Sequence, residues 1–155
     1  MPLLPAACSV RVQRDDFDIA DLQRSVLQDD AGAVVAFTGY VKAGPEATVT
    51  AIDLEHYPGM TEKSIAAIVQ EAQQRWSLKS IAVVHRVGRL AVGEQIVWVG
   101  ASATHRGDAF EGCEFIMDYL KTRAPFWKRE LGSFGRRWVE ARASDQSRAQ
   151  RWHKN

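Results

Sequence analysis

Residues 33–42 constrain the fold most, because their side chains alternate as in a β-strand and both resulting faces are apolar. One face carries Val35, Phe37 and Val41, and the other carries Val34, Ala36 and Tyr40. A strand that is apolar on both faces needs a packed layer on each of them. We therefore expect this strand at the centre of a sheet.

Further strand and helix patterns alternate along the chain without a linker, a repeat or a low-complexity segment. Hairpins mixed with helices predict an α+β fold: a single domain with a mixed or antiparallel sheet and packed helices. Residues 1–142 are expected to form this domain, and residues 143–155 a polar C-terminal tail. Asp15 or Asp16 is the expected N-cap of the first helix. Strands are expected at residues 9–13, 48–56, 81–87, 95–104, 127–130 and 137–142, a turn at 88–93, and helices at 17–28, 58–76 and 107–122.

Length and composition agree with one globular domain, since the chain has 155 residues, of which 46% are hydrophobic and 25% charged. The net charge of +1 argues against a protein that coats a polyanion. No apolar stretch approaches the ~20 residues that cross a bilayer, and the N-terminus, MPLLPAACSV, lacks the basic region of a signal peptide. Cys8 and Cys113 show no metal-ligand spacing. We therefore expect a reducing, cytoplasmic location and no metal site.

The near-neutral total hides a basic segment at residues 119–142, where seven Lys and Arg face two Glu, for a local net charge of +5. The acidic residues that balance it are concentrated before position 31. A run of basic residues is compatible with a solvated face. The alternative is a compact site for a phosphate or carboxylate ligand.

Two lysines in this segment stand out by their positions. Lys121 lies eleven residues after Phe110, so at about 100° per residue it is only ~20° away from the direction of Phe110 on a helix. It is either a lysine that snorkels at the helix end or an ammonium in a partly dry pocket, where burial and neighbouring cations lower the pKa of the amine. Lys128 follows Pro125, Phe126 and Trp127, which would aim it at one place or leave it on the surface.

Histidines supply weaker signals. His105 and Arg106 lie between a strand and a helix, where backbone N–H groups favour anions, although a lone histidine at a strand end is more often a structural residue. His85 alternates with apolar residues of a strand and is read as a histidine of the core or sheet. The chain contains no dinucleotide, Walker, serine-hydrolase or HExxH zinc motif, so we expect no cofactor.

Four longer runs carry a resemblance: FTGYVK at residues 37–42, LEHYPGMTEK at 54–63, HRVG at 85–88 and MDYLKTRAPFWKRE at 117–130. In them the chain resembles the large, catalytic subunits of molybdopterin synthase, from about residue 33 to residue 142. The resemblance implies an α+β fold with an α/β hammerhead portion. It also implies a sulfurtransferase of molybdenum cofactor biosynthesis, which converts cyclic pyranopterin monophosphate into molybdopterin by installing two dithiolene sulfurs.

The resemblance also implies partners. The sulfur is expected to arrive as a thiocarboxylate on the C-terminal glycine of a small ubiquitin-like subunit. The large subunit is expected to form a homodimer at the core of a heterotetramer. No nucleic acid or membrane is implied, and no cofactor. The alternatives are a non-catalytic scaffold that binds a ubiquitin-like tail and a nucleic-acid-binding module that uses the basic segment, which would show steeply salt-dependent binding.

The family's essential lysines fall on Lys121 and Lys128, which we expect to be catalytic. Its substrate-contacting positions fall on Tyr40, Val41, Lys42, His105, Arg106, Arg129, Glu130 and Arg142. The chain departs from the family pattern at Lys42, where arginine is usual. A lysine keeps the charge but loses the bidentate fork of a guanidinium.

Overall fold

A computed structural model of the chain describes residues 7–140 and 143–153. The strands in these residues are β1 Cys8–Gln13, β2 Ala33–Tyr40, β3 Val49–His56, β4 Leu78–Arg86, β5 Gly88–Ala91, β6 Gln95–Ala103, β7 Phe126–Gly132 and β8 Gly135–Val139. The α-helices are α1 Ile19–Val26, α2 Met60–Arg75, α3 Arg106–Leu120 and α4 Ala143–Gln150, with short 3-10 helices η1 Pro45–Ala47 and η2 Arg151–His153. None of the described helices has the length and apolar character to cross a bilayer.

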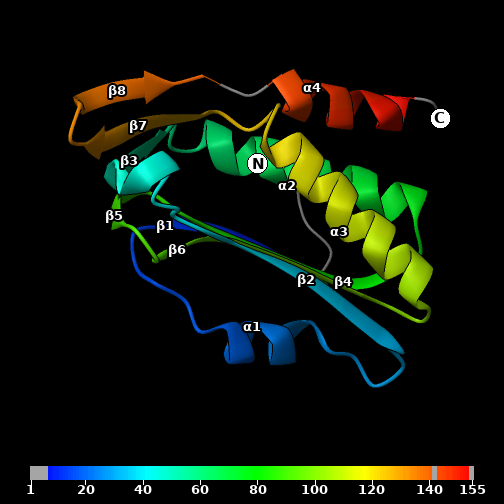
Figure 1. Cartoon of the computed structure of the whole chain (residues 1–155). Helices are drawn as coiled ribbons and strands as arrows, with labels where there is room; N and C mark the ends of the chain where they lie inside the picture. Colours follow the sequence, from blue (N-terminus) through cyan, green and yellow to red (C-terminus); the bar gives the residue numbers. More distant parts are fainter. Residues whose placement is uncertain (1–6, 141–142, 154–155) are drawn as a thin grey trace.

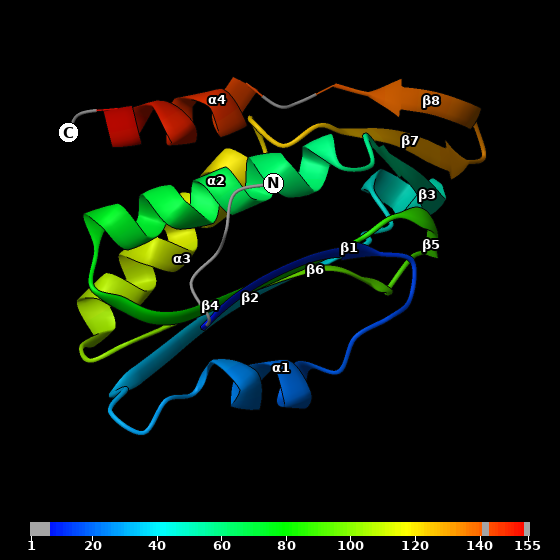
Figure 2. The same ribbon diagram turned by 180° about the vertical axis from the view of Figure 1, so that it is seen from behind.

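Sheet A has the strand order β1-β4-β6-β2, in which β1 and β4 run parallel and the other pairs antiparallel. Helix α1 covers one face of this sheet, and α2 and α3 cover the other (Figure 1, and from behind in Figure 2). The larger core lies beneath α2 and α3 and contains Ile65, Val83, Val99 and Phe115. A mixed sheet with packed helices confirms the predicted α+β class.

Sheet B has the order β5-β3-β7-β8 and is antiparallel throughout. It lies at one end of sheet A, at the upper left of Figure 1. Its apolar side includes Ile52, Leu54 and Leu90, which pack with Val41 and Val87. The expected turn at residues 88–93 was wrong in part, because Gly88–Ala91 is strand β5 and pairs with β3.

The segment at 33–42 does not lie at the centre of its sheet, contrary to expectation. Strand β2 pairs with β6 alone and forms the edge of sheet A, while β4 and β6 occupy the centre. Phe37 and Tyr40 are accordingly exposed, by 43% and 53%. Both faces of β2 are apolar because helices lie over both, and this pattern does not require a second strand partner.

The C-terminal residues correct a second expectation. The described part of residues 143–155 is not a polar tail, because it forms α4 and η2 and packs against α3. Ala149 is buried, and Trp152 contacts the larger core. At the other end of the chain, the N-cap of α1 is Asp18 rather than Asp15 or Asp16, and its carboxylate accepts the N–H of Asp21 at 3.1 Å.

Candidate active site

Three lysines from different parts of the chain converge beside sheet B. Lys121 caps the C-terminal end of α3, where its N–H donates to the carbonyl of Met117 at 3.3 Å. Lys128 is the third residue of β7 and shares a face of that strand with Phe126 and Glu130, since side chains alternate along a strand. Lys42 follows the end of β2. We call Lys42, Lys121 and Lys128 the lysine cluster.

The electrostatics of Lys128 show that the cluster is close enough to interact. Burial lowers the pKa of Lys128, and the positive charges of Lys121 and Lys42 lower it further. Glu130 and Asp145 of α4 oppose this shift. Lys128 is half-buried, whereas Lys121 and Lys42 are exposed. The partly buried amine with a lowered pKa, which was one reading of Lys121, is therefore found at Lys128 in the single chain.

Ion pairs divide the basic segment into neutralised and unneutralised groups. Among the described residues, the structure records no ion pair within 4 Å for any member of the lysine cluster. Three arginines of the segment do have acidic partners: Arg123 pairs with Glu71 at 2.9 Å, Arg129 with Asp53 at 3.8 Å and Arg137 with Glu130 at 3.0 Å. In the described part of the segment, Lys121, Lys128 and Arg136 have no ion pair within 4 Å, so their positive charge is available to a ligand, which favours the anion-site reading of the segment.

A shallow cleft of about 510 Å³ leads along α3 to Lys121. Phe110, Cys113, Met117 and Lys121 all line it, so the predicted alignment of Lys121 with Phe110 on one helix face is confirmed. Further residues of α3, the free edge strand β2 and α4 complete the lining: Glu114, Asp118, Val35, Ala36, Phe37, Asp145 and Arg148. Phe110 is 59% exposed in the single chain, which is unusual for a large apolar side chain facing a cleft.

Two predicted contact residues, Tyr40 and Val41, precede Lys42 in the chain. Tyr40 ends the exposed edge strand β2. Val41 is buried in the core of sheet B, and its N–H and carbonyl are already bonded to Glu94 and Gly93, at 3.0 and 2.8 Å. Val41 therefore anchors the strand that carries Lys42, and offers no free group to a substrate.

Other predicted contact residues are separated from the cluster. Arg129 projects from the face of β7 opposite to Lys128, and its guanidinium lies over the ring of Trp138 at 4.9 Å. His105 and Arg106 stand at the N-terminal end of α3, roughly 22 Å from Lys121 at 1.5 Å per residue. Arg142 lies outside the described residues.

The comparisons with known proteins agree with this site. The family model described as MoaE protein matches residues 12–123. The chain is 53% identical over 145 residues to the molybdopterin synthase catalytic subunit of Yersinia pestis, which covers 92% of this chain and 96% of that protein. This chain belongs to the MoaE family.

Solved structures extend the family likeness to the fold. The molybdopterin biosynthesis MoaE protein from Burkholderia ambifaria MC40-6 superposes with a TM-score of 0.79 at 47% identity, covering 96% of this chain and 99% of that one. A protein–protein complex of subunits 1 and 2 of molybdopterin-converting factor from Helicobacter pylori 26695 contains a chain with a TM-score of 0.72 at 19% identity. That match covers 86% of this chain and 91% of the other, and at this identity it shows a shared fold.

His85 of this MoaE chain, which the sequence predicts as a histidine of the core or sheet, packs as expected and lies beside the lysine cluster. The rings of His85 on β4 and Phe126 on β7 are stacked, with centroids 3.8 Å apart. Burial lowers the pKa of His85 to about 4, and the charges of Lys121 and His56 contribute to the shift. The run HRVG was a signal for His85, but strand alternation alone gave no hint of its contact with β7.

Neither cysteine takes part in the lysine cluster. Both thiols are free, and burial raises the pKa of Cys113 to about 12, so its thiolate is absent at neutral pH. Within residues 7–140 and 143–153, no group of three or more His, Cys, Asp or Glu side chains is placed to hold a metal ion. The groups that the structure brings together in the lysine cluster are three amines.

Proposed function

We propose that this chain is the catalytic subunit of a molybdopterin synthase. It transfers sulfur from the C-terminal thiocarboxylate of a small ubiquitin-like partner to cyclic pyranopterin monophosphate and so forms the dithiolene of molybdopterin. The observation that carries the proposal is the convergence of Lys42, Lys121 and Lys128, without acidic partners within 4 Å in the described residues, in a member of the MoaE family.

The charges of the two reactants explain why such a cluster is needed. The pyranopterin carries a phosphate and the partner tail carries a thiocarboxylate, so two anions have to meet in one site. Preorganised cations stabilise the negative charge that develops as sulfur leaves the thiocarboxylate carbon. Lys121 is assigned to the thiocarboxylate and the pterin. Lys128, which is half-buried, is assigned to the charge that develops during transfer.

A homodimer would bring together predicted site residues that lie far apart within one chain. His105 and Arg106 lie at one end of α3 and Lys121 at the other, so they do not share a site within one copy. The exposed Phe37 and Phe110 beside the cleft form an apolar surface that a second copy can cover. In such a dimer, His105 and Arg106 of one copy face the lysine cluster of the other.

The small partner subunit is supported by the Helicobacter pylori complex of the two converting-factor subunits, whose chain shares this fold. A cytoplasmic location is supported by the two free thiols, which are typical of a reducing compartment. We assign the chain as a sulfurtransferase because the partner delivers the sulfur. For the same reason, the proposed reaction assigns no metal or cofactor to this chain.

The test mixes the purified chain with the thiocarboxylated small subunit and cyclic pyranopterin monophosphate. We expect molybdopterin to form, detected after oxidation by its fluorescent derivative, with consumption of two thiocarboxylates per pterin. The same mixture with a small subunit that ends in a plain carboxylate is the control. Binding of the partner without any dithiolene product would support the scaffold instead.

A further inference from the structure

The residue that precedes β7 is tied to the start of α2 by a buried hydroxyl. Thr61 is fully buried, and its hydroxyl donates to the carbonyl of Pro125 at 2.9 Å. The same oxygen accepts the N–H of Tyr57 at 2.9 Å. Gly59, with φ of 85°, makes the turn between β3 and α2 that presents Thr61 in this way. One side chain thus connects two turns that are 64 residues apart in sequence.

The first residue of β7 is held by a second contact. The ring of Phe126 stacks on His85 at an interplanar angle of 17°. Nδ1 of His85 lies 2.8 Å from the carbonyl oxygen of Arg86. A carbonyl only accepts hydrogen bonds, so Nδ1 is the protonated nitrogen in this contact and the ring orientation is fixed.

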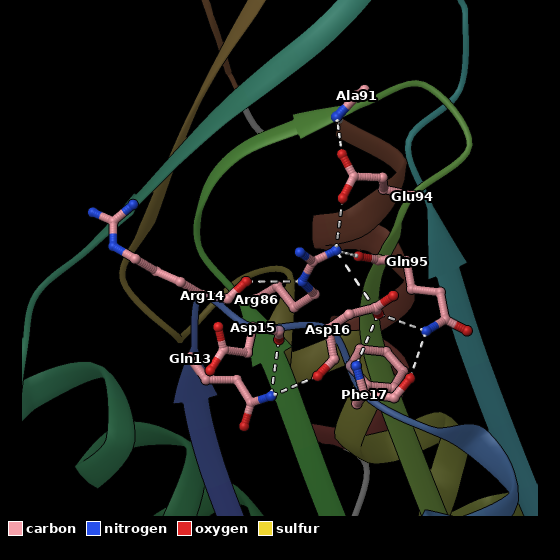
Figure 3. A network of polar contacts seen from close by, with 9 residues as sticks. All are labelled: Gln13, Arg14, Asp15, Asp16, Phe17, Arg86, Ala91, Glu94 and Gln95. Atoms are coloured by element: carbon pink, nitrogen blue, oxygen red, sulfur yellow. Dashed lines mark hydrogen bonds and ion pairs between the residues drawn. The ribbon is translucent and has the colours of Figure 1, made fainter.

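The strand residue that follows His85, Arg86, is held by a network of polar contacts, which Figure 3 shows. The buried guanidinium of Arg86 donates from Nε to the carbonyl of Arg14 at 3.1 Å, and from Nη1 to the carbonyl of Gln95 at 3.0 Å. It also pairs with Glu94 at 3.2 Å, and Glu94 accepts the N–H of Ala91 at 2.6 Å. These bonds join the ends of β1 and β4 to the turn between β5 and β6. Because His85 is the residue next to Arg86, its ring is held in place where Phe126 stacks on it.

Lys128 comes shortly after the two held residues, with Trp127 between Phe126 and Lys128. Phe126 and Lys128 project from the same face of β7, two positions apart. A shift of Pro125 or Phe126 would therefore move the ammonium relative to Lys121 and change how much of it is buried. Catalysis by a positioned charge is sensitive to such shifts, since a displacement of about 1 Å can reduce a rate by a factor of roughly 100.

We propose that Thr61 and His85 are positioning residues for Lys128: they hold Pro125 and Phe126 so that the ammonium keeps one place in the lysine cluster. The proposal rests on the proposed function for its effect on turnover. Its effect on the position of Lys128 does not depend on that function. Neither residue is required to touch the substrate or the thiocarboxylate.

The Thr61 contact is tested with Thr61→Val, which keeps the shape but loses the hydroxyl, and Thr61→Ser, which keeps the hydroxyl. Thr50→Val is a matched control, because the Thr50 hydroxyl donates to the carbonyl of Leu131 on the same strand at 3.2 Å, beyond Lys128. We expect Thr61→Val to lower kcat by about tenfold or more with little change in KM for the small subunit. Thr61→Ser and Thr50→Val are expected to stay within about threefold of the parent.

The His85 contact is tested with His85→Phe, which preserves a stacked ring, and His85→Ala, which removes it. We expect His85→Phe to retain most of the turnover and His85→Ala to lose it, again in kcat. Equal losses in both variants would mean that a ring nitrogen is needed, and would overturn the positioning role of the stack. If Thr61→Val is too unstable to be assayed, the comparison of His85→Phe with His85→Ala still tests the positioning proposal.

A second readout is independent of turnover. The pKa of Lys128 is measured by NMR titration of protein labelled at the lysine ε-carbon, with Lys128→Arg to assign the signal. Thr61→Val and His85→Ala should raise this pKa toward that of an exposed lysine, while Thr61→Ser and Thr50→Val leave it lowered. Unchanged kcat and pKa in both Thr61→Val and His85→Ala would overturn the proposal. An inactive parent whose Lys128 responds as expected would overturn the proposed function and leave the positioning role standing.

Discussion

The ring of His85 lies 3.8 Å from the ring of Phe126, centroid to centroid, and the two are nearly parallel. This contact joins sheet A to sheet B, because His85 belongs to β4 and Phe126 to β7. It also shields part of His85 from water. Burial, together with the charges of Lys121 and His56, lowers the pKa of His85 from 6.5 to about 4, so the ring is neutral at neutral pH.

The lowered pKa predicts a loss of stability in mild acid. The unfolded chain takes up a proton on His85 below about pH 6.5, whereas the folded chain does so only below about pH 4. The contribution of neutral His85 is therefore complete above pH 6.5 and is lost as the pH falls toward 4, by about 3 kcal/mol at most. Denaturant unfolding at several pH values should show His85→Phe losing less stability than the parent over this window. Parallel curves would contradict the assignment.

Lys121→Ala and Lys128→Ala should each abolish most sulfur transfer, by about 100-fold or more, because each removes a charge that stabilises the reacting anions. Both variants should still fold and bind the small subunit, since neither ammonium has an ion-pair partner within 4 Å in the described residues. Lys63→Ala, at an exposed position of α2, is the matched control. Near-normal turnover in Lys121→Ala or Lys128→Ala would remove the substituted lysine from the catalytic set. A strongly lowered melting temperature would instead assign that lysine a structural role.

Lys42→Arg should be tolerated, while Lys42→Ala should raise KM for the pyranopterin several-fold. Lys42 is exposed and its charge acts on Lys128, so it supplies positive potential where an anion binds. An arginine keeps this charge and adds donors in a planar fork. Steady-state kinetics at low substrate distinguish the two variants. Equal turnover in the alanine variant would show that Lys42 is only a solvated residue after the strand.

Lys121→Ala and Arg106→Ala should complement each other when mixed. If each site combines Lys121 of one copy with Arg106 of the other, a mixed dimer contains one intact site, and random exchange gives about a quarter of the parent activity. Light scattering at micromolar concentration checks that the variants are dimers. No recovery after demonstrated subunit exchange would place both residues in one chain's site, or remove Arg106 from it.

The sequence predicted the strands and helices better than it predicted which strands pair with one another. The apolar faces of residues 33–42 reported that β2 is covered on both sides, which is correct, but face patterns carry no information on hydrogen bonding at the strand edges. Gly88–Ala91 was missed for a related reason. A four-residue strand flanked by glycines has the local signature of a turn, and only its pairing with β3 makes it a strand.

For the candidate site, the sequence predicted the place of Lys121 on its helix but not which lysine is half-buried. Helix geometry alone placed Lys121 in line with Phe110 and Met117, and the cleft confirms this. Which lysine is dry depends on what β7 packs against, and this involves His85 and Thr61 from distant parts of the chain. The packing of α4 was missed because its residues are mostly polar, and its contact with α3 includes a hydrogen bond from Arg148 to Asp118, which lies far away in sequence.

Asp118→Asn should loosen the C-terminal helix from α3. The buried carboxylate accepts Nε of Arg148 at 3.3 Å, a guanidinium N–H of Arg151 at 2.9 Å and the indole N–H of Trp152 at 2.7 Å. An asparagine keeps the shape but removes the charge and one acceptor, so the free energy of unfolding should fall by about 1–3 kcal/mol.

Hydrogen exchange separates this local effect from a general one. Amides of α4 in Asp118→Asn should exchange faster, while those of β4 and β6 at the centre of sheet A change little. The control is Asp21→Asn, which removes an exposed pair with Arg24 on α1 and should lower stability by less than about 1 kcal/mol. If α4 keeps its protection in Asp118→Asn, the helix is held by Ala149 and Trp152 in the core, and the carboxylate contributes little to its docking.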